Sequence, residues 1–410
     1  MRPENELLLR LLKGESDDGR SSPSPCGVSQ DFDWGRFVSL CEWHNVVPIV
    51  YRALPAVCPG EIPPAVMNRF RSLCHNNTAR ALFLASELSR ILNALESCGI
   101  PAYPFKGPAL AVMLYGDPGR RQSSDLDILI PREQVSRAME VLDRLGYGAK
   151  SALDGPRLAA HRRTEYELQF FRRDGKLTVE LQWAVVPGFF GFDHEKLGIW
   201  SILEKRAWSG MAFPVLPPEE TLLLLSVHGA KHLWCKLGWV CDVAGLLASA
   251  APPDFHRVFE LAGQCGVTRL LHLGLLVAER LTGAPLPDDV SARIDADLMA
   301  GSLARKILAG FEEAPVNPDV DPRRYLFYFK LKERRRDQLL FAARLMATLA
   351  AGEWNPSPLP GCLFPISYCF RPIRMMLRHG RLLFGRGMAN HESVAPCHDK
   401  RIIAPANRCG

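Results

Sequence analysis

The sequence lacks three features that would assign it to a membrane, to a secretion route or to a zinc site. No stretch approaches the roughly 18–20 apolar residues of a membrane-spanning helix. The opening segment, MRPENELLLRLLKGESDD, carries acids where a signal peptide carries positive charge, and its apolar run is too short. The 12 cysteines include no C-x-x-C pair and no Cys/His spacing of the zinc-ligand type. These absences favour a cytoplasmic protein with buried free thiols.

The body of the chain also lacks net charge. The formal charge is +6, and residues 371–410 hold eight Lys/Arg against two Asp/Glu, which accounts for the whole excess. A neutral body argues against a broad nucleic-acid-binding face, whereas the basic tail argues weakly for an anionic partner. A solvated terminus is the alternative explanation of the tail. Nucleic acid is therefore a partner that the sequence allows but does not favour.

Length and hydrophobic periodicity predict an α+β fold in which a small mixed β-sheet is flanked by helical regions. A chain of 410 residues is long for one domain and comfortable for two. Apolar residues recur at helical spacing before residue 99 and again from 217 onward, and extended segments lie between. We expect a flexible N-terminus (1–30), a helical N-terminal region (31–99), an α/β core (100–216), a helical C-terminal domain (217–352) and a Pro-rich segment with a basic tail (353–410).

Several elements can be placed more closely. Within the flexible N-terminus, the run Leu7–Leu12 could form a docking helix, and the segment 64–98 reads as one long helix. In the core, a helix runs from Pro108 to about Tyr115, LDILI (126–130) is a strand, and TEYELQFFRR, a Asp-Gly turn and KLTVELQW (164–183) form a β-hairpin. The segment 325–351 reads as one amphipathic helix with a basic turn at its middle.

Three carboxylates are expected to converge in the core. Asp125 and Asp127 are two residues apart at the start of the LDILI strand, so their side chains point the same way. Glu180 lies on the second hairpin strand, which we place beside LDILI. Hard carboxylate oxygens are the ligands that Mg²⁺ prefers, with substrate phosphates completing its coordination. The three acids are therefore candidate ligands for two Mg²⁺ ions, with Mn²⁺ as an alternative.

Phosphate-binding groups precede the acids in the chain. Lys106 and Gly107 stand where the next helix begins, and a helix N-terminus offers free N–H groups and a positive dipole to phosphate oxygens. Arg121 follows in the loop before the aspartates and could neutralise further phosphate charge. Metal ligands beside a phosphate cradle indicate phosphoryl or nucleotidyl transfer.

A second polar cluster occurs in the C-terminal helices. His228 and His232 are four residues apart on a predicted helix, and Lys231 lies beside them. The lysine disfavours a zinc site. The helix face could turn toward substrate phosphates or an acceptor, or its polar groups could simply be hydrogen-bonded within a helical bundle, and the sequence leaves both open.

The stretch FKGPALAVMLYGDPGRRQSSDLDILI resembles a bacterial family of uncharacterised nucleotidyltransferases within the polymerase-beta-like superfamily. The matching positions are Lys106, Gly107, Tyr115, Arg121, Asp125, Asp127 and Gly146-Tyr147. The helices around 33–54 and HGAKHLWCKLGWVCDVAGLL (228–247) are also similar to the family. One departure is Gln182, where the family commonly has a histidine, so a role for that histidine does not carry over.

The resemblance implies transfer of an NMP from an NTP, such as ATP, to an acceptor hydroxyl, with release of pyrophosphate. Asp125 and Asp127 would bind both metals, Glu180 would bind the catalytic metal, and Lys106, Gly107 and Arg121 would hold phosphates. The alternatives are a catalytically inactive nucleotide-binding or interaction protein with the same fold, and a phosphotransferase that uses the γ-phosphate. The acceptor, the nucleotide base and the oligomeric state cannot be read from the sequence.

Overall fold

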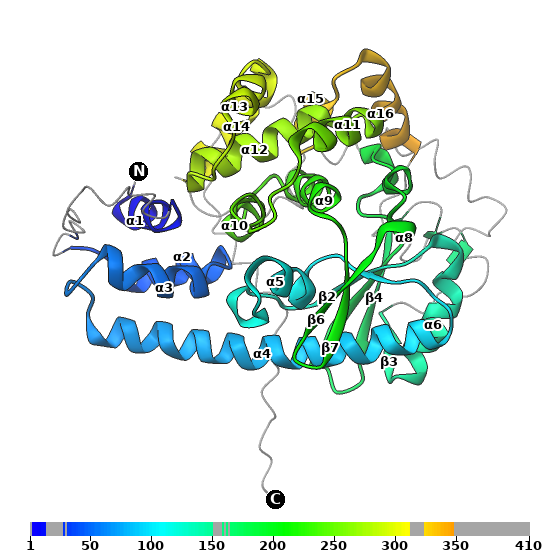
Figure 1. The fold of residues 1–410 in the computed structure, drawn as a ribbon, viewed down its shortest axis with the longest axis horizontal. Helices are drawn as coiled ribbons and strands as arrows, with labels where there is room; N and C mark the ends of the chain where they lie inside the picture. The colour runs from blue at the N-terminus through cyan, green and yellow to red at the C-terminus, as the bar shows by residue number, and fades with distance from the viewer. Residues whose placement is uncertain are drawn as a thin grey trace, which may run out of the picture.

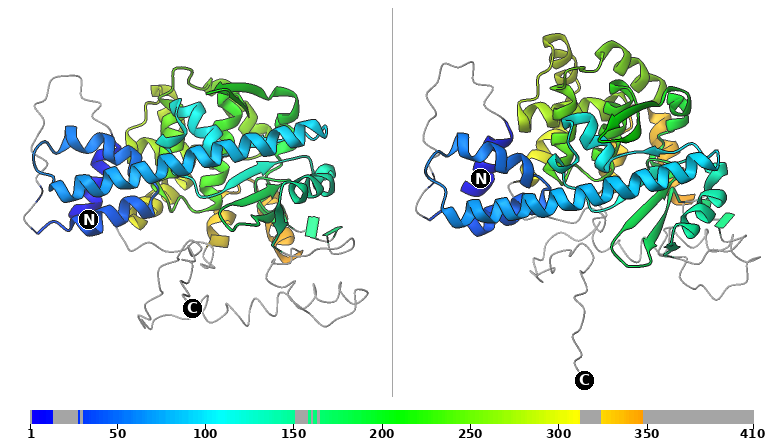
Figure 2. Two further views of the ribbon diagram at one scale, coloured as in Figure 1. Left: turned by 90° about the horizontal axis from the view of Figure 1, so that it is seen from below. Right: turned by 60° about the horizontal axis from the view of Figure 1, so that its bottom comes forward.

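A computed structural model describes residues 2–13, 28, 31–150, 158–159, 161–162, 165–311 and 324–347. It confirms the predicted α+β class: long helices surround one small mixed sheet and one hairpin (Figures 1 and 2). Residues 14–27 and 29–30 of the predicted flexible N-terminus, the Pro-rich segment and the basic tail (353–410) fall outside the described residues.

The main sheet has five strands in the order β1-β2-β5-β4-β3. Strands β2 and β5 run parallel, and the other neighbouring pairs are antiparallel. The inner strands are rich in Leu, Ile and Val, whose side chains are buried on the sheet as expected for covered strands. The strand bounds are β1 Tyr103–Pro104, β2 Leu126–Leu129, β3 Tyr147–Ala149, β4 Glu167–Arg172 and β5 Thr178–Gln182.

The predicted hairpin and its placement are confirmed. Strands β4 and β5 are joined at the Asp-Gly turn, where Gly175 has a φ of 72°, a conformation that favours glycine. The second strand of the hairpin lies beside β2, with Leu126 opposite Val179. The helix that leads into β2 is α5 (Gly107–Tyr115), followed by the short helix η1 (Pro118–Arg120).

Helix α4 (Pro64–Ser97) is the single 34-residue helix that the sequence predicts. It runs along one side of the molecule, past both the N-terminal helices and the sheet (Figure 1). Phe70, near its start, belongs to the hydrophobic core of the helical regions. Leu84, Leu88 and Ile91 belong to a second core beneath the sheet. One helix therefore supplies side chains to both cores.

The N-terminal region is built from three shorter helices. They are α1 (Pro3–Leu12), α2 (Trp34–Trp43) and α3 (Val47–Val57). The predicted docking helix is α1, whose leucines Leu7, Leu8 and Leu11 are buried. The boundary of the flexible N-terminus at residue 30 is therefore wrong for residues 3–12, because these leucines bury their apolar surface against α3 and α12.

The remainder of the chain is helical, as predicted, with two differences. The expected helix 325–351 is instead two helices that break at Lys332, whose carbonyl accepts hydrogen bonds from the side chains of Arg269 and Gln338. The hairpin β6–β7 was not foreseen, although its Ser209-Gly210 turn, with φ of 47° and 77°, is a typical hairpin signal.

The bounds of these elements complete the description. The hairpin consists of β6 Glu204–Trp208 and β7 Met211–Val215. The smaller elements of the core are η2 Arg132–Gln134, α6 Val135–Arg144, η3 Gly188–Phe190, η4 His194–Leu197 and α8 Ile199–Ile202. The C-terminal helices are α9 Pro218–Lys231, α10 Leu237–Leu247, α11 Phe255–Cys265, α12 Thr268–Thr282, α13 Asp288–Asp295, α14 Leu298–Gly310, α15 Arg324–Leu331 and α16 Arg335–Ala347.

Two expectations drawn from absences can be compared with the structure. Within the described residues, no helix combines the length and the apolar character needed to cross a membrane. Six described cysteines are free thiols, including the buried Cys41 and Cys241. Cys58 is disulfide-bonded, so the expectation of free thiols is wrong at that position.

Candidate active site

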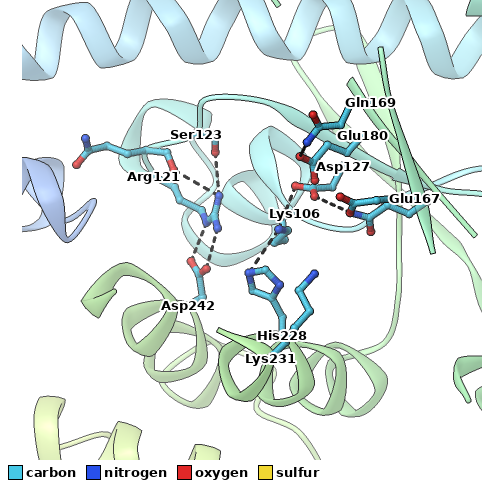
Figure 3. Close-up of polar contacts among 12 residues, drawn as sticks. Lys106, Arg121, Ser123, Asp127, Glu167, Gln169, Glu180, His228, Lys231 and Asp242 are labelled. Atoms are coloured by element: carbon cyan, nitrogen blue, oxygen red, sulfur yellow. Dashed lines mark hydrogen bonds and ion pairs between the residues drawn. The ribbon is translucent and has the colours of Figure 1, made fainter. Parts of the chain in front are cut away.

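Lys106 lies at the centre of the candidate site, between the sheet and helix α9 (Figure 3). It directly precedes α5, and its side chain is 14% exposed. Its Nζ lies 3.1 Å from Oδ2 of Asp127 and 3.4 Å from Nε2 of His228. Burial alone would lower the pKa of this ammonium group, but the nearby carboxylates of Asp127, Asp125 and Glu180 raise it. A positive charge is thus held among the predicted acids.

The structure brings the three predicted acids together at the start of the two parallel strands. Asp127 on β2 lies directly opposite Glu180 on β5, the strand that the sequence analysis places beside LDILI. Asp125 immediately precedes β2, and its charge is close enough to influence the pKa values of both Lys106 and Glu180. The roles of these acids in metal binding and catalysis stay predictions.

Glu180 has a strongly perturbed acidity. Burial is the largest cause, followed by the negative charge of Glu167 and then that of Asp127, and together they raise its pKa to about 8. Its Oε1 accepts a 3.0 Å hydrogen bond from Nε2 of Gln169. Because carboxylates are crowded here, a bound cation would favour the ionised form of this group.

Glu167 is a site residue that the sequence analysis missed. Nε2 of Gln182 donates to Oδ1 of Asp127 at 2.9 Å and to Oε2 of Glu167 at 3.4 Å. Burial raises the pKa of Glu167, with Asp127 adding to the effect and Lys231 opposing it. The hairpin register, which places Glu167 opposite Gln182, is the signal that could have identified this acid.

Lys231 approaches the same cluster from α9, on the side opposite the sheet (Figure 3). Its Nζ donates to the hydroxyl of Tyr166 at 3.2 Å and lies 4.6 Å from the centre of that ring. Burial lowers the pKa of Lys231, while the charge of Glu167 acts in the opposite direction. Two lysines therefore lie near the acids: Lys106, which precedes α5, and Lys231 on α9.

The two predicted histidines are packed in an aromatic cluster. The ring centres of His228 and His232 are 4.8 Å apart, and Trp239 lies 5.2 Å from the first and 4.9 Å from the second. Burial lowers the pKa of both imidazoles well below the usual value, with the positive charge of Lys106 adding to the effect at His228. Both rings are therefore neutral at pH 7. His228 contacts the site through Lys106, and a substrate-facing role for His232 stays a prediction.

Helix α5 presents its N-terminus beside the acids. Gly107, its first residue, has a φ of 66°, and a methyl group there would lie 3.8 Å from the carbonyl oxygen of Asp125. Glycine is the residue type that adopts this conformation without strain. Because Lys106 directly precedes α5, the free N–H groups that a helix offers at its first turn begin beside this lysine, which is the arrangement expected for a phosphate cradle.

Arg121 is held by the C-terminal helices. Its Nε and Nη2 each donate to a carboxylate oxygen of Asp242, on α10, at 2.8 Å, and its Nη1 donates to Oγ of Ser123 at 2.8 Å. Burial would lower the pKa of Arg121, but the charge of Asp242 raises it. The phosphate contact predicted for Arg121 stays a prediction and requires the guanidinium to exchange these partners.

The acid cluster fits a hard divalent cation in the chemistry of its donors. Asp127 and Glu180 occupy paired positions on neighbouring strands, Asp125 immediately precedes β2, and burial together with the neighbouring carboxylates raises the pKa of Glu180. Within the described residues, no group of three His, Cys, Asp or Glu side chains stands ready to hold a metal ion. At Asp127, the two carboxylate oxygens already contact Lys106, as Figure 3 shows, and Gln182.

Comparisons with known proteins identify the family of the chain. Residues 30–283, more than half of the chain, match the family model described as "Uncharacterised nucleotidyltransferase". A crystal structure of "an antigenic nucleotidyltransferase-like protein" from Paracoccidioides brasiliensis is similar at a TM-score of 0.33 and 16% identity, covering 52% of this chain and 92% of that one. No curated protein matches the sequence. On the family match, which spans all the site residues named above, the chain belongs to the uncharacterised nucleotidyltransferase family.

Proposed function

We propose that the protein is a Mg²⁺-dependent nucleotidyltransferase that transfers an NMP from an NTP to an acceptor hydroxyl and releases pyrophosphate. The observation that carries this proposal is the placement of Lys106. It precedes α5 directly and lies 3.1 Å from Asp127, which in turn lies opposite Glu180. A phosphate-binding cation and helix terminus thus adjoin a cluster of metal-type ligands, as phosphoryl-group transfer requires.

Each residue of the site has a separate role in the proposed reaction. Lys106 and the first N–H groups of α5 bind the phosphates of the NTP. Glu180, in its ionised form, accepts the proton of the acceptor hydroxyl as the new O–P bond forms at the α-phosphate and the bond to pyrophosphate breaks. Asp125, Asp127 and Glu180 would hold Mg²⁺, which when bound neutralises phosphate charge.

A second candidate function is nucleotide binding without transfer. It is favoured by one observation: both oxygens of Asp127 already contact N–H donors, from Lys106 and Gln182. In that case Mg-NTP would bind and no pyrophosphate would appear. A phosphotransferase would instead move the γ-phosphate and leave an NDP.

The test is label transfer from each α-³²P-labelled NTP in the presence of Mg²⁺ and a cell extract, with pyrophosphate measured in parallel. We expect the wild type to label an acceptor and the Asp127→Asn variant to lose labelling while its circular dichroism is unchanged. The matched control is Asp143→Asn, since this aspartate lies on α6 with its side chain 72% exposed. Labelling that survives in Asp127→Asn and in Asp125→Ala/Asp127→Ala would refute the proposal. In a parallel reaction with γ-³²P-labelled NTP, a labelled product would identify a phosphotransferase.

A further inference from the structure

A second cavity, separate from the acid cluster, is lined mainly by positive charge. Its volume is about 280 Å³, and it lies between helix α16, the short helix η3 and the C-terminal end of α11. Figure 1 shows α16 and α11 on the same side of the molecule. None of the predicted site residues lines it. Its charged lining residues are five cations and one acid: Lys196, Lys332, Arg334, Arg336, Arg344 and Asp337.

Lys332 forms the buried part of this lining. Its residue is only 5% exposed, and its Nζ donates to the carbonyl oxygen of Phe190. Burial lowers its pKa to about 8, with Arg344 adding to the effect and Asp337 opposing it. Because burial disfavours the charged form of this ammonium group, an anion bound in the cavity would stabilise that form.

The geometry at Gly191 shows how closely the cations approach one another. A methyl group at this position would lie 3.3 Å from Nη1 of Arg344 and 3.7 Å from Nζ of Lys332, so the two cationic groups are no more than about 7 Å apart. Gly191 has a φ of 73°, which lets the backbone pass close to both without a side chain. Two positive charges at this spacing can both contact the oxygens of a single phosphate group.

The cavity has little acid to balance its charge. Within the described part of the chain, Lys196, Lys332, Arg334 and Arg336 form no ion pair with an Asp or Glu side chain. Asp337 is the one acid of the lining. Glu333, outside the lining, also acts electrostatically on Lys332. Because clustered like charges repel, an anion bound among them would relieve part of this repulsion.

We propose that this cavity binds a small molecule that carries two or more linked phosphate groups. Several cations around one cavity match a chain of phosphates, whose oxygens accept bidentate arginine contacts. The limited volume of the cavity and the buried Lys332 favour a small ligand over a nucleic acid, which would need a continuous exposed basic surface. The ligand could be inorganic polyphosphate or a nucleoside polyphosphate, because both present the same chemistry to the cavity.

The test is isothermal titration of the full chain with sodium tripolyphosphate in the absence of divalent cations. Arg336→Gln, which removes an exposed lining cation, should weaken one class of site about tenfold or more. The matched control is Arg335→Gln, also exposed and adjacent in α16 but not part of the lining, which should change the affinity less than about twofold. Lys106→Met should leave this class of site unchanged, because Lys106 belongs to the active site.

Each outcome decides the proposal. Equal weakening in Arg335→Gln and Arg336→Gln would show non-specific charge attraction and overturn it. Loss of all binding in Lys106→Met would assign the phosphates to the active site and also overturn it. Titration of Lys106→Met with ATP distinguishes the ligand sources: tighter binding than tripolyphosphate supports a nucleotide, and equal binding supports the phosphate chain alone. Arg336-dependent binding of a 20-nucleotide RNA without binding of tripolyphosphate would overturn the small-ligand proposal.

Discussion

The contribution of the contact between Arg121 and Asp242 to stability can be tested by replacing one carboxylate oxygen of Asp242 with an amide NH₂ group. Asp242→Asn preserves the shape of the side chain and removes its charge, which leaves the buried guanidinium facing one carbonyl oxygen and one NH₂ group. The two side chains are 12% and 3% exposed. The contact joins the loop before β2 to helix α10, so its loss would weaken the attachment of the sheet to the C-terminal helices.

The size of the effect follows from the geometry. At the observed 2.8 Å between Nε and Oδ1, the attraction is about 6 kcal/mol at an effective dielectric constant of about 20. Dehydration of both ions offsets much of this, but removing one partner leaves the other buried and unpaired, which costs about 3–5 kcal/mol. That is a large part of the roughly 5–15 kcal/mol that stabilises a typical folded protein.

The assay is urea unfolding followed by circular dichroism, with the free energy of unfolding compared between variants. A matched control exists in Asp295→Asn, because Asp295 pairs with Arg280 at the same 2.8 Å while its side chain is 58% exposed. Exposed pairs contribute about 0–1 kcal/mol. We therefore expect a large loss of stability in Asp242→Asn and a small one in Asp295→Asn.

The reasoning would be refuted by equal, small losses in Asp242→Asn and Asp295→Asn. A second check is Arg121→Met/Asp242→Leu, which replaces the ion pair by apolar groups and should be more stable than Asp242→Asn. The same double variant tests the phosphate contact predicted for Arg121. If it folds and binds NTP as tightly as the wild type, Arg121 is a structural residue only.

Three further predictions concern acidity, packing and the acid cluster. Burial lowers the pKa of His44 to about 4, so below about pH 6.5 the unfolded chain takes up a proton that the folded protein does not. The free energy of unfolding should therefore fall by up to about 3 kcal/mol as the pH approaches 4. In urea titrations at pH 7.5, 5.5 and 4.5, His44→Gln should show a shallower fall than the wild type. Gly229→Ala would place a methyl group 2.5 Å from the ring of Trp234 and should lower the stability measured by thermal unfolding by about 1–3 kcal/mol. In the control Gly263→Ala, the added methyl group meets nothing within 4 Å, and this variant should be as stable as the wild type or more so. Equal melting temperatures of the two variants would contradict this prediction. Gln182→Ala removes the donor shared by two carboxylates and should reduce label transfer about tenfold with the fold retained; unchanged transfer would show that this donor does not position the acids.

Local patterns predicted most of the fold because each rests on short-range chemistry. The Asp-Gly turn fixes the register of the hairpin, and a proline-free run ending at Gly99 defines the long helix α4. The break at Lys332 could not be predicted in this way, because it depends on a hydrogen bond from Arg269, 63 residues away. Periodicity alone continues through such a position.

In the candidate site too, short-range patterns could be predicted from the sequence and long-range contacts could not. The neighbouring positions of Asp127 and Glu180 follow from strand alternation and from placing one strand beside the other. The partner of Arg121 could not be derived, since Asp242 is 121 residues away on another element. Glu167 was within reach, but no pattern of acids on its own strand marked it, and only the cross-strand register gives its place.

The shared membership of α4 in both hydrophobic cores has a consequence for how the molecule comes apart. The helix is about 50 Å long at 1.5 Å per residue, and its backbone hydrogen bonds join residues that support the N-terminal helices to residues that support the sheet. Neither half can melt without exposing apolar surface that the other half needs for its own packing. The predicted boundary at residue 99 therefore marks a change of architecture but does not separate two units that unfold independently. Amide hydrogen exchange along α4 should report a single cooperative opening.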